Sequence, residues 1–503
     1  MRPSYRHRVV AAVGMASFLL HVVGTPAREP AAVAREGPAA GRPIRRPAEP
    51  MQRSARSPTA DPAVVAAAAR ESDPHHQVRH AVAQQAQASL AAYSVPAASA
   101  AAASRTGGLR GPLTLNALEA MALENNPTLA QARAAVQAAY GQYVQAGLYP
   151  NPSGGYTASE IGNDGRSGQQ GAFLGQEIVV ARKLQWSQHA AAHEVERAEQ
   201  LLEAQRYRVL TAVRINFYEA LTAQRTVKLA EELAKISEEA VEAARAMLHA
   251  QQAARPDLLQ ARIEANRARI LLTAAQAQQR AAWQRLTAVV GMPDMPPTPL
   301  EGELVPEIQE LEVGQVRERL LAASPELQAA ERAVLRARAA LERARREPIP
   351  NLQTQAGIAY DVASDYSIAS VQVGVSLPIF DRNQGNIQSA EAELVAAQWE
   401  VERIRLDLQS RLAPVLQAYA TASAQVRRYS EQILPDAKET LRLITEGYRQ
   451  GEFGYLNLLT AQRTYFEANL AYLQALRDWW TARLQIDGFL LSDGLARPEG
   501  LPN

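Results

Sequence analysis

The chain contains the same pattern of segments twice, about 200 residues apart. Four short motifs recur in the same order in the two copies. The pairs are Asn126-Pro127 with Ser324-Pro325, Tyr149-Pro150-Asn151 with Ile349-Pro350-Asn351, Gln176-Glu177-Ile178 with Leu377-Pro378-Ile379, and Leu258-Leu259-Gln260-Ala261 with Leu458-Leu459-Thr460-Ala461. Each copy has the order helix, two strands, very long helix, turn, helix. Because such a unit cannot bury its apolar face alone, the repeat predicts an assembly.

Composition agrees with long helices. The 503 residues are rich in Ala, Gln, Glu, Arg and Leu, and only 6% are aromatic, a mix typical of helical coiled coils. A net charge of +1 gives no reason to expect nucleic acid as a partner, since nucleic acid requires a concentrated basic face. The absence of cysteine excludes disulfides, thiolate metal sites and cysteine nucleophiles.

The N-terminal segment 1–27 has the features of an export signal. Three arginines precede the apolar stretch Val9 to Val23, which is too short to span a bilayer comfortably. We therefore expect a cleaved signal peptide, with a retained membrane anchor as the alternative. Residues 28–108 are rich in Pro, Ala and Arg and are predicted to be a disordered leader.

The two repeats and their connections can be assigned from proline, glycine and periodicity. Asn126 and Ser324 are predicted N-caps, because each precedes a proline at the first helical position. Residues 183–250 contain no proline or glycine and would span roughly 100 Å as one helix. The predicted organisation is a first repeat 109–292 with hairpin 153–181, a linker 293–312, a second repeat 313–491 with hairpin 352–380, and a tail 492–503.

The second long helix, 384–450, carries two apolar seams and is expected to be kinked at Pro414 and Pro435. One seam has a strict seven-residue period, which favours a left-handed supercoil. Two seams require two neighbouring helices, as in a ring, although an ordinary solvated coiled coil would show the same period. The seams are Ile387, Leu394, Val401, Leu408 and Val415, and then Leu412, Tyr419, Val426 and Ile433. In each repeat, two shorter helices stacked end to end would match one long helix.

The second hairpin alternates apolar with polar or small residues, as strands of an outer-membrane barrel do. The predicted lipid-facing residues are Val371, Val373, Val375, Leu377 and Ile379. Glu160 and Glu177 disturb the alternation in the first hairpin. A hairpin packed on a soluble core would alternate in the same way.

Four strands cannot close a barrel in lipid, so several chains are needed. Two chains would give eight strands, and three would give twelve and leave room for a pore; we favour three.

The sequence resembles the TolC family of outer-membrane efflux channels, and within that family it most resembles the cobalt-zinc-cadmium resistance channels. The resemblance covers roughly 110–491. It is carried by Leu377 to Gly385, Leu434-Pro435-Asp436-Ala437, Gly447 to Gly451, and Leu458 to Gln462. It implies a mainly α fold with a β-barrel part: a homotrimer with a twelve-stranded barrel in outer-membrane lipid and a long periplasmic α-barrel. It also implies two partners, a periplasmic membrane-fusion adaptor and an inner-membrane pump of the resistance-nodulation-division type.

In that family, the turns 251–255 and 451–454 would form a gate at the periplasmic tip. Tyr448 matches the gate tyrosine. Phe453, Asn457 and Thr460 replace an arginine and two aspartates that better-known members carry at these positions. Arg255 and Asp257 lie at the first-repeat turn. Asp257 has two possible roles, as one carboxylate of a three-chain acidic ring or as a first-turn acid that favours the helix dipole.

No convincing catalytic or metal-binding motif is present. His189 and His193 lie four residues apart on a helix, but Ala190 stands where a zincin motif has glutamate, so a surface pair is expected. His75, His76 and His80 lie in the leader. We expect no enzyme and no cofactor. The predicted function is a passive outer-membrane exit duct for heavy-metal cations or small toxic compounds. The alternatives are a type I protein-secretion duct and a non-conducting periplasmic tether.

Overall fold

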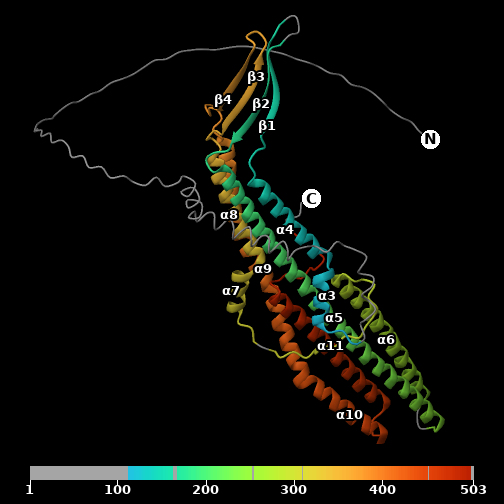
Figure 1. The fold of residues 1–503 in the computed structure, drawn as a ribbon. Helices are drawn as coiled ribbons and strands as arrows, with labels where there is room; N and C mark the ends of the chain where they lie inside the picture. The colour runs from blue at the N-terminus through green and yellow to red at the C-terminus, as the bar shows by residue number, and fades with distance from the viewer. Residues whose placement is uncertain (1–110, 163–166, 252–253, 309, 451, 500–503) are drawn as a thin grey trace, which may run out of the picture. The chain divides into compact units, whose positions relative to one another are not determined.

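The computed structural model describes residues 111–162, 167–251, 254–308, 310–450 and 452–499. The predicted signal peptide and leader, with their histidines, lie outside these residues. Figure 1 shows long helices that run side by side, with four strands beyond the ends of α4, α5, α8 and α9. The first repeat consists of α3 (Leu115–Asn125), α4 (Pro127–Ala146), β1 (Ser153–Ile161), β2 (Ser167–Ile178), α5 (Lys183–His249) and α6 (Arg255–Val290).

The second repeat has the same order of elements. It consists of α7 (Val313–Ala323), α8 (Pro325–Arg346), β3 (Leu352–Asp361), β4 (Tyr366–Val375), α9 (Gln384–Arg428), a π-helical turn (Tyr429–Ile433), α10 (Leu434–Gln450) and α11 (Tyr455–Asp487). Helix α7 is the counterpart of α3 and was not predicted from the sequence. The π-helical turn lies just before Pro435, where an interruption was predicted, whereas α9 continues through Pro414.

The two predicted N-caps behave differently. Asn126 Oδ1 accepts a hydrogen bond from Thr128 N at 2.9 Å, which confirms the cap of α4. Ser324 also occupies the N-cap position of α8, as predicted, but its side chain makes no cap hydrogen bond. Its buried hydroxyl has no hydrogen-bond partner among the described residues. Pro325 still starts α8, because proline has no N–H to satisfy and its φ already suits the first helical turn.

The shorter helices of the first repeat meet end to end along α5. At the junction, the Asn126 amide at the start of α4 donates a hydrogen bond of 2.7 Å to Val289 O near the end of α6. Gly291 follows α6 with a φ of 83°, and a Cβ there would lie 2.5 Å from Asn125 O. The close approach of the two chain segments therefore requires glycine. The predicted stacking of two short helices against one long helix is confirmed.

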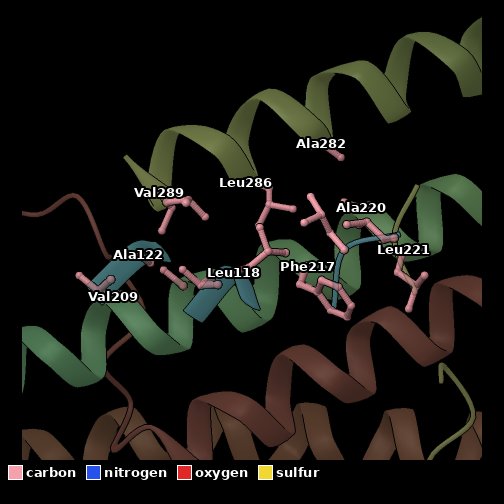
Figure 2. Packing of buried hydrophobic residues seen from close by; sticks show 14 of the residues in the cluster. Leu118, Ala122, Val209, Phe217, Ala220, Leu221, Ala282, Leu286 and Val289 are labelled. Atoms are coloured by element: carbon pink, nitrogen blue, oxygen red, sulfur yellow. The ribbon is translucent and has the colours of Figure 1, made fainter. Parts of the chain in front are cut away.

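The main apolar core lies at this junction. Figure 2 shows Leu118 of α3, Phe217 of α5 and Leu286 of α6 packed together, and each is almost completely buried. The second repeat has a smaller equivalent, in which Leu327 of α8 and Leu408 of α9 pack with Phe489 beyond α11. The described part of the C-terminal segment returns to the first junction, where Gly494 O accepts from Thr128 Oγ1 at 3.2 Å. Packing at two junctions therefore connects both repeats to the C-terminal segment.

Both predicted seams of the second long helix contribute to packing, but not along their whole length. Leu408 of the first seam and Leu412, Tyr419 and Val426 of the second are buried in the chain itself. Ile433, at the end of the second seam, is exposed. Residues from both seams therefore bury against neighbouring helices of the same chain, as expected for a helix with two neighbours.

Candidate functional site: the two-faced sheet and the helical tip

The four strands form one antiparallel sheet in the order β1-β2-β3-β4. Residues directly opposite each other in an antiparallel pair share a face, so the register assigns every side chain to one of two faces. One face is mainly apolar, with Gln170, Gln176, Thr354 and Ser367 as polar exceptions, and carries Tyr156, Ala158, Ala172, Leu174, Ile178, Leu352, Ala356, Ile358, Tyr360, Val371, Val373 and Val375. The other is mainly polar or small, with Phe173, Tyr366 and Ile368 as apolar exceptions, and carries Ser153, Thr157, Ser159, Gln169, Glu177, Gln353, Gln355, Asp361, Ser370 and Gln372.

The predicted alternation is confirmed for β4, where Val371, Val373 and Val375 are exposed on the apolar face. The prediction that the strand extends through Leu377 and Ile379 was wrong, although both side chains are exposed. The strand ends at Val375 because its partner is Leu352, the first residue of β3, so the residues beyond it have no pairing partner on β3. That all five residues contact lipid remains a prediction.

The two glutamates of the first hairpin have different positions. Glu177 pairs with Gln353 on the polar face, so it does not disturb the alternation as the sequence suggested. Glu160, near the end of β1, has a left-handed backbone with a φ of 58°, which is uncommon for a residue with a side chain. The first hairpin therefore extends the apolar face across all four strands.

The sheet has two open edges within one chain. Strands β1 and β4 are its edges, and they do not pair with each other among the described residues. Unpaired backbone groups at an edge are not tolerated in the hydrocarbon core of a membrane. A sheet of this kind can therefore cross lipid only when further copies of the chain pair with both edges.

At the opposite end of the helices, the helical hairpin of the first repeat packs against that of the second. Residues from α5, α6 and α11 form a small apolar cluster, here called the tip cluster: Val241, Ala244, Leu258, Ala261, Ala265, Tyr455 and Leu459. Tyr448 of α10 packs against it. The tip cluster therefore joins the helical hairpin of the first repeat to that of the second.

Two tyrosines of the second hairpin contact the first one, Tyr448 through a hydrogen bond and Tyr455 through apolar packing. Tyr448 Oη donates to Met247 Sδ at 3.4 Å, and the rings of Tyr448 and Tyr455 are 6.3 Å apart. Burial raises the pKa of Tyr455 to about 12, with smaller contributions from the nearby charge of Glu264 and from Tyr448. Burial, followed by the charge of Asp257, also raises the pKa of Tyr448. Both hydroxyls therefore stay neutral at ordinary pH and can donate hydrogen bonds.

Asp257 lies in the first turn of α6, close enough to influence both tyrosines. Its Oδ2 accepts a hydrogen bond from Ala254 N at 3.1 Å, and its own N–H donates to Ala254 O at 3.0 Å. These contacts match the first-turn role considered from the sequence. Whether three copies of Asp257 also form an acidic ring stays a prediction.

The remaining predicted tip residues do not converge on one point. The Phe453 ring covers Gly447, where a Cβ would overlap the ring, and Glu452 N donates to Gly447 O at 2.8 Å. Arg255, Asn457 and Thr460 are exposed, and Thr460 Oγ1 donates to Leu456 O within α11 at 2.9 Å. Their part in a gate remains a prediction.

Sequence reasoning missed the charged link between the hairpins. Arg463 of α11 forms an ion pair with Glu264 of α6, and Arg267 bonds the same carboxylate at 2.8 Å. Glu264 is nearly buried, with its side chain 13% exposed. Tyr455 and Met247 were also missed. For Tyr455, a usable signal was its position directly after the turn and one heptad after the predicted gate tyrosine Tyr448.

The histidine pair forms part of a polar surface. His193 Nδ1 lies 3.1 Å from Glu196 Oε2, and Arg332 of α8 bonds the same oxygen at 3.1 Å. The rings of His189 and Trp186 are 5.6 Å apart. Within the part of the chain that the structure describes, no group of three acidic or histidine side chains could hold a metal ion.

None of the described helices combines the length and apolar character needed to cross a membrane.

An open sheet with one apolar and one polar face, attached to long paired helices, defines a wall subunit of an oligomeric duct. Comparison with known proteins supports this class of protein. Residues 118–292 and 316–490 match the family model described as outer membrane efflux protein, one match for each repeat. The chain belongs to this family. It is an outer-membrane efflux protein with a periplasmic helical part, and it is not an enzyme.

Among curated proteins, the chain is 31% identical to the cobalt-zinc-cadmium resistance protein CzcC of Cupriavidus metallidurans, over 76% of this chain and 90% of that protein. Solved structures share the fold. The open-state MtrE outer membrane channel of Neisseria gonorrhoeae has a TM-score of 0.64 at 22% identity, covering 77% of this chain and 91% of that one. The outer membrane protein VceC of Vibrio cholerae has a TM-score of 0.62 at 20% identity, covering 75% of this chain and 96% of that one.

Proposed function

We propose that this protein is the exit duct of a tripartite efflux system that expels divalent heavy-metal cations across the outer membrane. The observation that carries the cargo assignment is the 31% identity with CzcC over 90% of that protein's length. The two-faced sheet supports a role as the wall of a pore, because its apolar and polar faces suit lipid and water.

Three chains would complete the wall. Each supplies four strands, and pairing of β1 with β4 of a neighbour would close a twelve-stranded barrel without free edges. The helices would supply four columns per chain: α5, α9 continued by α10, and one stack of two shorter helices in each repeat. Twelve columns would continue twelve strands. The exposed apolar residues on α9, Val395, Trp399 and Leu406, are available to pack against a neighbouring copy.

The helical tip would act as the gate. The tip cluster, the Tyr448–Met247 hydrogen bond and the Glu264–Arg463 ion pair all join the two hairpins of one chain. Opening would require these contacts to separate or slide. Binding of a periplasmic adaptor together with an inner-membrane pump of the resistance-nodulation-division type would provide that free energy, and the duct itself would be passive.

Gene deletion and complementation test the cargo. Cells lacking the gene are expected to lose tolerance to cobalt, zinc and cadmium, and the intact gene is expected to restore it. Loss of drug tolerance alone would contradict the metal assignment, and loss of secretion of a protein would favour a type I secretion duct.

Single-channel recording of the purified oligomer in lipid bilayers tests whether the protein forms a pore. An oligomer that never conducts, even with Tyr448→Ala at its tip, would favour the non-conducting tether.

A further inference from the structure

The polar face of the sheet is hollowed near the end that joins the helices. A cavity of about 400 Å³ lies there, bordered by residues of all four strands and by the segment that precedes β1. Its polar groups include the amides of Asn151, Gln353, Gln355 and Gln372. Glu177 is the one acidic side chain that borders it within the described residues, and no basic side chain borders it.

The carboxylate of Glu177 is held in place from the second repeat. Asn351 Nδ2 donates to Glu177 Oε1 at 2.7 Å, and Asn351 Oδ1 accepts from Val180 N at 3.4 Å. Asn351 thus connects the end of β2 with the segment that follows it. Among the described residues, Glu177 Oε2 has no hydrogen-bond partner. Glu177 thus borders the cavity with a carboxylate that is fixed through one oxygen and has acceptor capacity left on the other.

The donor set of this cavity decides which ligands it can take. Its side chains offer carboxylate, amide and hydroxyl oxygens, and no histidine borders it. Oxygen ligands suit hard, hydrated cations, whereas tight chelation of zinc or copper needs imidazole or thiolate. One carboxylate per chain with neutral oxygens would attract a cation without retaining it, which is what conduction requires.

We infer that Glu177 and the amides around it form a cation-selective site inside the duct, at the level where the strands join the helices. The inference rests on the proposed function, in which the polar face lines the lumen and each copy of the chain contributes one Glu177. The carboxylates would raise the local concentration of cations and exclude anions. Selection of charge would then occur in the barrel as well as at the tip.

Ion selectivity of the purified channel in planar bilayers tests this site. With a KCl gradient, the wild type is expected to favour K⁺ over Cl⁻, and Glu177→Gln is expected to lower that permeability ratio at least about twofold. The recordings are made in an Asp257→Asn background, so that a carboxylate at the tip does not hide the effect. Mg²⁺ in the bath is expected to reduce K⁺ current through the Glu177 channel more than through the Glu177→Gln channel.

The register offers a matched control. Gln353 lies directly opposite Glu177 on the same face, so the double variant Glu177→Gln with Gln353→Glu moves the carboxylate to the next strand. This variant is expected to recover most of the selectivity, which a purely structural role of Glu177 would not produce. An unchanged permeability ratio in a conducting Glu177→Gln channel would overturn the inference and leave the duct intact. A wild-type oligomer that does not conduct would refute the proposed function, and the inference with it.

Discussion

The hydroxyl of Tyr448 on α10 donates to the sulfur of Met247 on α5 at 3.4 Å, across 201 residues of sequence. The bond joins the two helical hairpins at the tip. A thioether is a weak acceptor, so most of the contribution of Tyr448 comes from its ring, which packs on the tip cluster. The link is therefore mainly a packing contact with a directional hydrogen bond added.

Substitution at Tyr448 should separate these two contributions. Tyr448→Phe is expected to cost the closed tip about 0.5–1 kcal/mol, the typical net value of one hydrogen bond. Tyr448→Ala also removes the ring and is expected to cost roughly 3 kcal/mol. The open fraction in single-channel recordings measures both, with Tyr465→Phe, on α11 outside the tip cluster, as the control. Equal open fractions in wild type and Tyr448→Ala would show that this contact does not hold the tip closed.

The ion pair between Glu264 and Arg463 should hold the same hairpins together. Glu264→Gln is expected to raise the open fraction, because Arg463 loses a nearly buried partner. A double-mutant cycle with Arg463→Gln is expected to give a coupling energy of about 1 kcal/mol. Glu242→Gln, which affects an exposed Glu242–Arg245 pair within α5, is the matched control. A coupling energy near zero would mean that the pair is incidental.

The tip should loosen at high pH. The pKa of Tyr455 is raised by burial to about 12, above its unfolded value of about 10. A raised pKa means that the closed tip favours the neutral phenol. This contribution to stability is therefore complete below about pH 10 and is lost as the pH rises through about 12. Burial shifts the pKa of Tyr448 in the same direction.

Hydrogen exchange of the α11 amides between pH 9 and 12, corrected for the intrinsic rate, is the measurement. Tyr455→Phe keeps the ring but cannot ionise, so it is expected to reduce the alkaline loosening. The same loosening in wild type and Tyr455→Phe would assign the effect to other groups, and Tyr472→Phe on the same helix serves as the control. The pKa of Tyr472 is also raised by burial, but this residue lies outside the tip cluster.

Adjacent residues of β4 should tolerate charge very differently. Val373 lies on the apolar face and Gln372 on the polar face. Val373→Arg is expected to destabilise the assembled barrel by about 2–4 kcal/mol if it lies near the bilayer midplane, because it places a charge against lipid. Gln372→Arg is expected to have little effect, since its side chain would face water. The temperature at which the detergent-resistant oligomer dissociates measures both, and equal effects would contradict the assignment of the faces.

Local sequence patterns predicted much of the fold. The repeat gave the order of the elements, and proline and glycine gave most of their ends, because these residues act on the backbone where they stand. The side-chain period of two assigned Val371, Val373 and Val375 to one face correctly, since alternation is a local property of a strand. The cap at Asn126 was likewise a local feature.

Contacts between distant segments could not be predicted in this way. Whether the Ser324 side chain caps its helix, where β4 stops, and which face carries Glu177 depend on neighbours that lie far away in the chain. The same is true of Glu264 with Arg463 and of Glu177 with Asn351, whose members belong to different repeats. The sequence by itself determined most of the elements, their order and their amphipathic faces, because these follow from short-range sterics and periodicity, although α7 was missed. Only the tertiary structure decided which residues meet, because the stacking of long helices fixes the register between segments that the chain separates.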